Sequence, residues 1–275
     1  MRHCSGGNIE VLISSYICLF TIYSIFGWIF ETLYCTLKTG KWENRGFLYG
    51  PVCPVYGTGA AAIILIVESA ENRGVILRPW QVFAISVIGS MVLEYCTSLV
   101  LEKIFHAVWW DYNHLPLNIQ GRTSLLTSMA FGCGGLLIIY KLAPLNRNLL
   151  EQLPPVLAEV LALVLVFLFA VDITLTVSVL HNFDKLVIRV EERFNQNMDM
   201  LVDGAASRTN RIKQGIVDTK SHLEEQISSL SEFARSAIGR AHYFRDSNKK
   251  RESLKNQILS VIIKAMGRSN TSEDN

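Results

Sequence analysis

The sequence predicts an all-α membrane protein, with about five transmembrane helices over residues 1–180 and a long helical, coiled-coil-like soluble tail over residues 181–275. Charge is the first reason: the part through Leu180 holds ten Lys/Arg and eleven Asp/Glu, whereas the last 95 residues hold sixteen and thirteen. Several apolar stretches also reach the ~18 residues needed to cross a bilayer core. Finally, every proline lies at or before Pro155, so the chain beyond it can stay helical.

Four of the expected spans are apolar over their whole length. They cover residues 11–37, 80–104, 123–140 and 156–180. A further span is expected between the first two, but its clear helical part, residues 55–67, reaches only about 20 Å. The apolar, Gly- and Pro-containing segment 46–54 would supply the missing length. It is either a buried re-entrant turn or an interfacial loop that leads into a tilted helix, because irregular backbone at membrane depth needs protein or water around it.

An odd number of spans places the two termini on opposite faces of the membrane. The short loops on the tail's face then carry eight Lys/Arg, and those on the other face carry five. The positive-inside rule therefore predicts a multi-pass protein of the cell membrane with a cytoplasmic tail.

The tail is expected to begin with one long helix over about residues 181–243. Apolar or small residues recur there from Phe183 to Ile227, a distance of 44 residues in twelve steps, or 3.67 residues per step. This eleven-residue period predicts a nearly straight or slightly right-handed seam. The seam must meet either a second copy of the chain, through helix–helix self-association, or the tail's own last segment.

That last segment is expected to be a short amphipathic helix over about residues 251–266. Its apolar face contains Leu254, Ile258, Val261, Ile262 and Ala265. Such a helix either lies on the membrane surface or folds back on its neighbour in the tail.

Ionisable side chains within the apolar spans are the first candidates for a functional site. A charge there costs at least ~2.5–3.5 kcal/mol on insertion scales, and it usually faces the protein interior or an aqueous cavity. Glu31, Glu94 and Asp172 all fall in the tail-side half of the bilayer, whereas Glu159 begins a helix and suits its dipole. The loops on the tail's face bring Arg45 and Arg122 as cationic partners.

Smaller polar residues support a polar lining. Ser86, Ser90, Glu94 and Ser98 recur every four residues, and Ser124, Ser128, Gly132 and Gly135 form a face that permits close helix packing. Asp111, which precedes Arg122 in the same loop, joins the candidate site, although it also suits a role in pinning that loop. The structural alternative is that all of these groups are ion pairs and packing contacts without a substrate.

Motifs for catalysis, cofactors and metals are not found. The sequence lacks GxGxxG, the phosphate-binding GxxxxGK[ST], HExxH and GxSxG. The cysteines form no CxxC pair, and the loop histidines lack the spacing of metal ligands. No basic run with interleaved aromatics indicates nucleic-acid binding. We therefore expect no cofactor, no metal site and no nucleic-acid partner, and nothing argues for an enzyme.

Two ordered runs resemble a known family. They read YSIFGWIFE at residues 23–31 and GKWENRGFLYGPVCPVYG at residues 40–57, and they are followed by LEY at 93–95, WWDY at 109–112 and GR at 121–122. These motifs resemble the bacterial membrane family described as putative ABC-transporter type IV, or CmpB-like, over about residues 15–145. The resemblance implies a transport permease. Because the chain has no phosphate-binding loop, ATP-driven transport would need a separate ATPase subunit.

Three functions are consistent with these observations. The first is a transport-related permease subunit whose polar site is lined by Glu31, Arg45, Glu94, Arg122 and Asp172. The second is a non-transporting membrane anchor or scaffold whose helical tail mediates assembly. The third, an intramembrane enzyme acting on lipid, needs a nucleophile that the sequence does not reveal.

Overall fold

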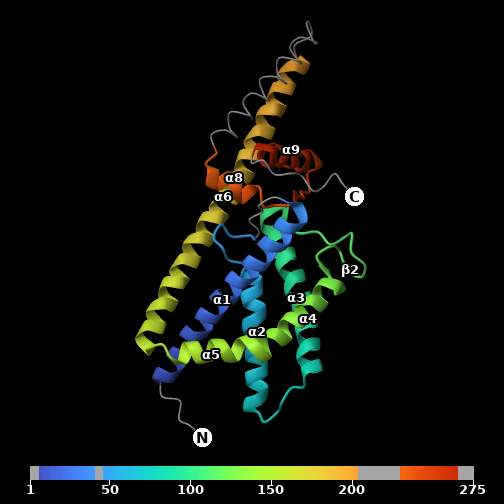
Figure 1. Cartoon of the computed structure of the whole chain (residues 1–275). Helices are drawn as coiled ribbons and strands as arrows, with labels where there is room; N and C mark the ends of the chain where they lie inside the picture. The colour runs from blue at the N-terminus through green and yellow to red at the C-terminus, as the bar shows by residue number, and fades with distance from the viewer. Residues whose placement is uncertain (1–5, 41–45, 204–229, 266–275) are drawn as a thin grey trace. The chain divides into compact units, whose positions relative to one another are not determined.

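A computed structural model describes residues 6–40, 46–203 and 230–265, and these residues are mostly helical (Figure 1). The chain divides into two compact units. Unit 1 comprises Met1–Leu101 and Trp109–Thr174, and unit 2 comprises Glu102–Val108 and Leu175–Asn275.

Within the described residues, four helical segments are long and apolar enough to cross a membrane, judged by length and composition. They are Ile13–Lys38 in α1 (Gly6–Thr39), Pro79–Phe105, which is α3, Leu125–Asn146, and Pro155–Arg189 in α6 (Pro155–Asp203). The third segment joins α4 (Leu125–Leu137), the π-helix η1 (Ile138–Leu142) and the start of α5 (Ala143–Glu151). Each coincides with one of the four long apolar stretches in the sequence.

The expected additional span corresponds to α2 (Pro54–Asn72), which is not among these four. At 19 residues, α2 is longer than the predicted 55–67 and reaches about 28 Å. Pro54 begins it, where a missing N–H costs nothing. The count of five spans therefore depends on whether α2 crosses the membrane.

Glycines bring α1 and α2 into close contact (Figure 1). A Cβ at Gly57 of α2 would lie 2.2 Å from Ser24 Oγ and 2.4 Å from the Phe20 carbonyl oxygen of α1. A Cβ at Gly27 of α1 would lie 2.2 Å from the Tyr56 ring. A larger residue at Gly27 or Gly57 would collide with the neighbouring helix, so the two helices could not lie this close together.

The predicted small-residue face of α4 packs against α3. Ser128 is fully buried, and a Cβ at Gly132 would lie 2.7 Å from Phe83 and Val87. Gly135 similarly lies against Ser86. The structure thus confirms that this face allows close helix packing.

Unit 2 differs from the single long helix that the sequence predicted over 181–243. Its described elements are α6 beyond Thr174, β1 (Ala107–Val108), α8 (Glu232–Ile238), β4 (Tyr243–Phe244) and α9 (Lys249–Ala265). Ser231 caps α8 by accepting the Ala234 N–H at 3.1 Å, and β4 pairs antiparallel with β1. Pairing with a distant strand cannot be read from a helical period. The seam residues from Ala205 to Ile227 lie outside the described residues.

Helix α9 lies close to the predicted 251–266 and folds back within unit 2. Ile258 and Ile262 are fully buried, Leu259 is 3% exposed, and Val261 is 43% exposed. The buried face is therefore rotated from the predicted one and includes Lys255, which has no solvent exposure. Of the two readings of this helix, the described contacts match folding back on its neighbours.

Candidate functional site: a buried carboxylate and hydroxyl network

The network in unit 1 begins at the interface of α1 and α2. Tyr56 donates a hydrogen bond of 2.6 Å from its hydroxyl to Glu31. Gly27 lies one helical turn before Glu31 on the same face of α1, so its missing side chain makes room for the Tyr56 ring that reaches Glu31. The ring of Phe131 in α4 also packs against the Tyr56 ring, with the two centroids 5.2 Å apart.

Glu94 of α3 is the most buried carboxylate of the predicted site, at 5% exposure. The Thr123 hydroxyl donates to it at 2.8 Å, and the Tyr112 hydroxyl donates at 3.3 Å. Thr123 Oγ1 also lies 3.4 Å from Ser128 Oγ in α4. Glu94 is therefore held by hydroxyl donors from the loop between α3 and α4.

Tyr112 connects Glu94 with Glu31 electrostatically. Burial, then the charges of Glu94 and Glu31 and the hydrogen bond to Glu94, raise the pKa of Tyr112 well above its usual value. Tyr112 is consequently a neutral donor at physiological pH. The two carboxylates thus share one tyrosine environment, formed by residues from α1, α2, α3 and the loop.

The loop that carries Tyr112 and Thr123 is folded by a short hairpin of β2 (Asn118–Ile119) and β3 (Thr123–Ser124). Gln120 and Gly121 both have positive φ, +53° and +68°, and the Arg122 N–H donates to the Ile119 carbonyl oxygen at 3.0 Å. Positive φ at both central positions is typical of a type I′ turn. The turn places Thr123 opposite Ile119 and directs it to Glu94.

Asp111 stabilises this loop from within. Its carboxylate accepts the Asn113 N–H at 2.9 Å, which is an Asx turn. A Cβ at Gly121 would lie 2.5 Å from the same carboxylate, so glycine is required there by both space and φ. The backbone N–H of Tyr112 donates to the Gly121 carbonyl oxygen at 2.8 Å, which closes the loop.

Arg122 contacts α3 next to the network. Its Nη1 donates to Ser98 Oγ at 3.2 Å, and its guanidinium carbon lies 5.8 Å from the centroid of the Tyr95 ring. Its carbonyl oxygen accepts the Trp110 indole N–H at 2.9 Å. The contacts of Arg122 therefore orient the loop along the serine stripe of α3, one turn beyond Glu94.

Asp172 of α6 contacts the irregular segment before α2. Its two carboxylate oxygens accept the Tyr49 and Gly50 N–H groups at 3.0 and 2.9 Å. Leu48 beside them is 1% exposed, and the Cys53 N–H donates to the Ser24 carbonyl oxygen at 2.9 Å. These acceptors satisfy backbone donors that an apolar, non-helical segment would otherwise leave unpaired.

The six predicted site residues thus have different places in the structure. Glu31 and Glu94 belong to the hydroxyl network, Arg122 and Asp111 shape the loop that supplies its donors, and Asp172 holds segment 46–54. Arg45 lies outside the described residues.

Sequence reasoning missed the hydroxyl donors. Tyr56 and Tyr112 stand inside the family motifs, next to Gly57 and Asp111, but neither was predicted to belong to the site. The spacing of Gly27 and Glu31 by four residues was a usable signal, because it places an open position one turn from an acid on the same helix face.

Chemically, the network offers oxygen atoms to a positively charged or proton-donating guest. Two carboxylates and three hydroxyls offer oxygen acceptors inside apolar helices. Among the described residues, no group of three or more His, Cys, Asp or Glu is arranged to hold a metal ion.

Comparisons with known proteins agree with the motif resemblance. No curated protein and no solved structure matches the chain. One family model, described as "Putative ABC-transporter type IV", matches residues 18–177, which is more than half of the chain. That range contains Glu31, Tyr56, Glu94 and the whole loop that supplies Tyr112 and Thr123. The chain therefore belongs to the putative ABC-transporter type IV family.

Proposed function

We propose that this protein is the permease subunit of a transporter and works with a separate ATPase subunit. One observation carries the proposal: Glu94, 5% exposed within an apolar helix of membrane-spanning length, is surrounded by hydroxyl donors. An ionisable group in such a helix is a functional candidate by default, because its insertion is costly and serves no packing need. Glu31, which shares Tyr112 with Glu94, extends the site to α1.

The proposal includes a membrane topology of five spans. The hydroxyl of Tyr16 donates to Glu68 near the end of α2, while Tyr56 near its start donates to Glu31. Helix α2 therefore accompanies α1 from residue 31 back to residue 16, a rise of about 22 Å against a ~30 Å core. This supports α2 as a fifth span. With five spans, the protein is a multi-pass protein of the cell membrane and its tail lies in the cytoplasm.

The alternative function is a membrane anchor whose tail assembles other proteins. The compact fold of unit 2, with its own buried core of Phe244, Ile258 and Ile262, favours this alternative because a folded module can act independently of Glu94. Self-association through the tail belongs to the same alternative.

Affinity purification of the full chain in mild detergent separates the two functions. We expect an ATPase subunit to co-purify, and the complex in vesicles to hydrolyse ATP. Glu94→Gln should retain the ATPase subunit but lower the coupled activity by at least about tenfold, the usual effect of removing an essential ionisable group. The matched control is Glu71→Gln, an exposed carboxylate at the end of α2, which should leave the activity unchanged. Purification without an ATPase subunit would favour the anchor.

A further inference from the structure

Residues 102–108 of unit 2 are held by an extensive set of contacts from the C-terminal segment. Ala107 and Val108 pair with Phe244 and Tyr243 in the β1–β4 ladder. Beyond the ladder, the His242 N–H donates to the Val108 carbonyl oxygen at 2.6 Å. Ala107 is fully buried, so the pairing with β4 shields it from water. A two-residue strand such as β1 would not be stable without this support.

Arg245 extends the attachment to the end of α3. Its backbone N–H donates to the His106 carbonyl oxygen at 2.8 Å, and its guanidinium lies 3.1 Å from Glu102. The Tyr243 hydroxyl accepts from the same guanidinium at 2.8 Å and fixes its direction. Backbone pairing and an ion pair thus hold both ends of residues 102–108.

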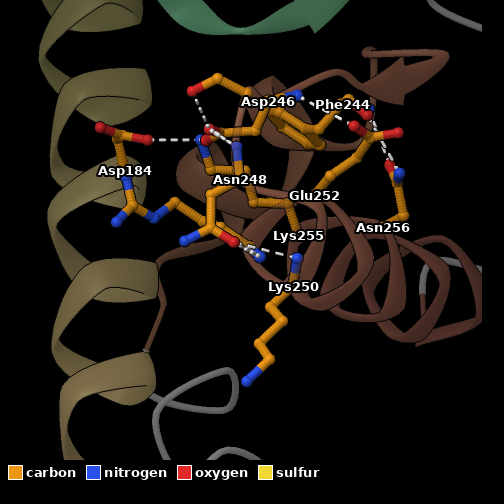
Figure 2. Close-up of polar contacts among 10 residues, drawn as sticks. Asp184, Phe244, Asp246, Asn248, Lys250, Glu252, Lys255 and Asn256 are labelled. Atoms are coloured by element: carbon orange, nitrogen blue, oxygen red, sulfur yellow. Dashed lines mark hydrogen bonds and ion pairs between the residues drawn. The ribbon is translucent and has the colours of Figure 1, made fainter.

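Helix α9 in turn fixes β4. The Asn256 side chain accepts the Phe244 N–H at 2.7 Å and donates to the Phe244 carbonyl oxygen at 3.0 Å (Figure 2). An amide that satisfies both backbone groups of one residue imitates a neighbouring strand. The Phe244 ring is 1% exposed and packs against Phe183 of α6, with the two centroids 5.1 Å apart.

Lys255 closes the arrangement. Its ammonium lies 2.5 Å from Asp184 of α6 and 3.0 Å from Asp246, and the side chain is 1% exposed (Figure 2). A buried ammonium is costly unless it is paired, and here two carboxylates from different elements share it. Removal of Lys255 or of one of the two carboxylates leaves a buried charge without its partner. The three side chains therefore tend either to be all in contact or all separated.

Residues 102–108 connect α3 to the loop that carries Tyr112 and Thr123. The segment follows the part of α3 that carries Glu94, and it is bonded directly to Trp109, where the loop with Tyr112 and Thr123 begins. His106 has φ +52°, and its N–H donates to the Glu102 carbonyl oxygen at 2.9 Å, which ends α3 in an αL cap. An αL conformation in a residue other than glycine persists where its surroundings hold it, and here β4 does so.

We propose that β4 and α9 together form a clasp that fixes residues 102–108 and thereby controls the loop that supplies hydroxyl donors to Glu94. Opening the clasp releases the αL turn at His106 and loosens the loop that begins at Trp109. The carboxylate network is then regulated from the C-terminal unit through chain continuity, whatever the network binds. This inference rests on the geometry of the network and not on the proposed transport function.

Hydrogen exchange of the full-length protein in detergent tests the clasp. Asn256→Ala removes both bonds to Phe244, and its control is Gln257→Ala, an exposed amide at the next position of α9. We expect Asn256→Ala to speed exchange about tenfold in peptides from 102–108, from the loss of two hydrogen bonds. Peptides from 109–124 should exchange about threefold faster, while those from 54–72 and those of the control variant should be unchanged.

Each result decides the proposal. Faster exchange confined to 102–108 would show that the attachment is local and would overturn the coupling. Unchanged exchange in 102–108 would overturn the clasp itself. If Asn256→Ala prevents folding, Glu102→Gln replaces it, because this variant weakens the contact with Arg245 without altering α9. It should speed exchange in peptides from 102–108 and, to a smaller extent, in those from 109–124.

Discussion

Hydroxyl donors suit Glu94 better than a guanidinium would. Tyr112 and Thr123 carry no charge, so burying them costs less free energy than burying an arginine. They also leave the charge of Glu94 unneutralised, so the carboxylate can still bind and release a positively charged ligand. The sequence identified Glu94 because an acid in an apolar stretch is conspicuous. It did not identify Thr123, because a threonine at the start of a helix has several ordinary roles.

The hydroxyl of Thr123 should therefore contribute to stability. We expect Thr123→Val, which keeps the shape, to lower the free energy of unfolding by ~1–3 kcal/mol, because a buried carboxylate loses a donor. Thermal unfolding in detergent measures this. Thr58→Val is the matched control, since that hydroxyl is exposed and donates to its own helix backbone at 2.9 Å. Equal effects of the two changes would contradict the role of Thr123.

Backbone strain at His106 gives a second prediction. Since φ is +52° there, His106 already bears the αL cost of ~1–2 kcal/mol that any residue with a Cβ bears, and His106→Val should lower the free energy of unfolding further. β-branching makes this conformation worse still, whereas His106→Gly should be tolerated. His114→Val, in an exposed part of the loop, serves as the control in the same melting experiment. Equal stability of the Val and Gly variants would argue against strain at this position.

At the level of elements, small residues decide which helix faces meet. The sequence showed this for α4, where serine and glycine recur on one face, and it placed four of the helices well because apolar length is a strong signal. It did not show that Gly57 lies against the Phe20 backbone, because one glycine in a Gly-rich segment has no period.

Gly57→Ala should separate α1 from α2. The added methyl meets a backbone oxygen at 2.4 Å, which cannot move as a side chain can, so we expect a loss of ~1–3 kcal/mol in thermal unfolding. Gly89→Ala in α3 is the opposite case, because nothing lies within 4 Å of its Cβ position. That variant should be neutral or stabilise by up to about 1 kcal/mol through helix propensity. A tolerated Gly57→Ala would mean that the two helices can shift apart.

The element that the sequence described least well is the C-terminal segment. Strand β4 is two residues long and pairs with a segment more than 130 positions earlier, so neither composition nor period predicts it. Lysine is rarely buried, so the sequence gives no sign that Lys255 lies in the core. Its two carboxylate partners explain the exception, and they come from segments that the sequence alone does not bring together.

The clasp should weaken in acid. Burial alone would raise the pKa of Asp246, but the Asn248 N–H and the hydrogen bond and charge of Lys255 outweigh it and lower the pKa below its usual value. A lowered folded-state pKa stabilises the protein above the unfolded-state value of about 3.9, and this stabilisation is lost as pH falls through the folded-state pKa. The difference in unfolding free energy between the wild type and Asp246→Asn should therefore shrink below about pH 4. A difference that is constant with pH would contradict this prediction.

For the whole molecule, charge and apolar length were sufficient to predict a mostly helical protein with four apolar helices of membrane-spanning length, because both are properties of long segments. The number of spans was harder, since it turns on one helix. Helix α2 contains Gly57, Thr58 and Gly59 near its start and Glu68 and Glu71 near its end. These residues lower its apolar character, although its length and its packing on α1 are compatible with a span.

The membrane topology depends on whether the segments before and after α2 lie on the same face of the membrane. If α2 crosses the membrane, residues next to Gly40 and Gly74 lie on opposite faces, and if it does not, they lie on the same face. Single-cysteine variants at these two positions, labelled from outside intact cells with an impermeant reagent, should therefore give opposite results. Position 113 and the C-terminal end should both be protected, as expected for a cytoplasmic tail. Positions 74 and 113 flank α3 and must differ in either case, which controls for labelling efficiency. Labelling at both 40 and 74 would reduce the spans to four and place the N-terminus on the tail's face, while the carboxylate network would keep its contacts between α1, α2 and α3.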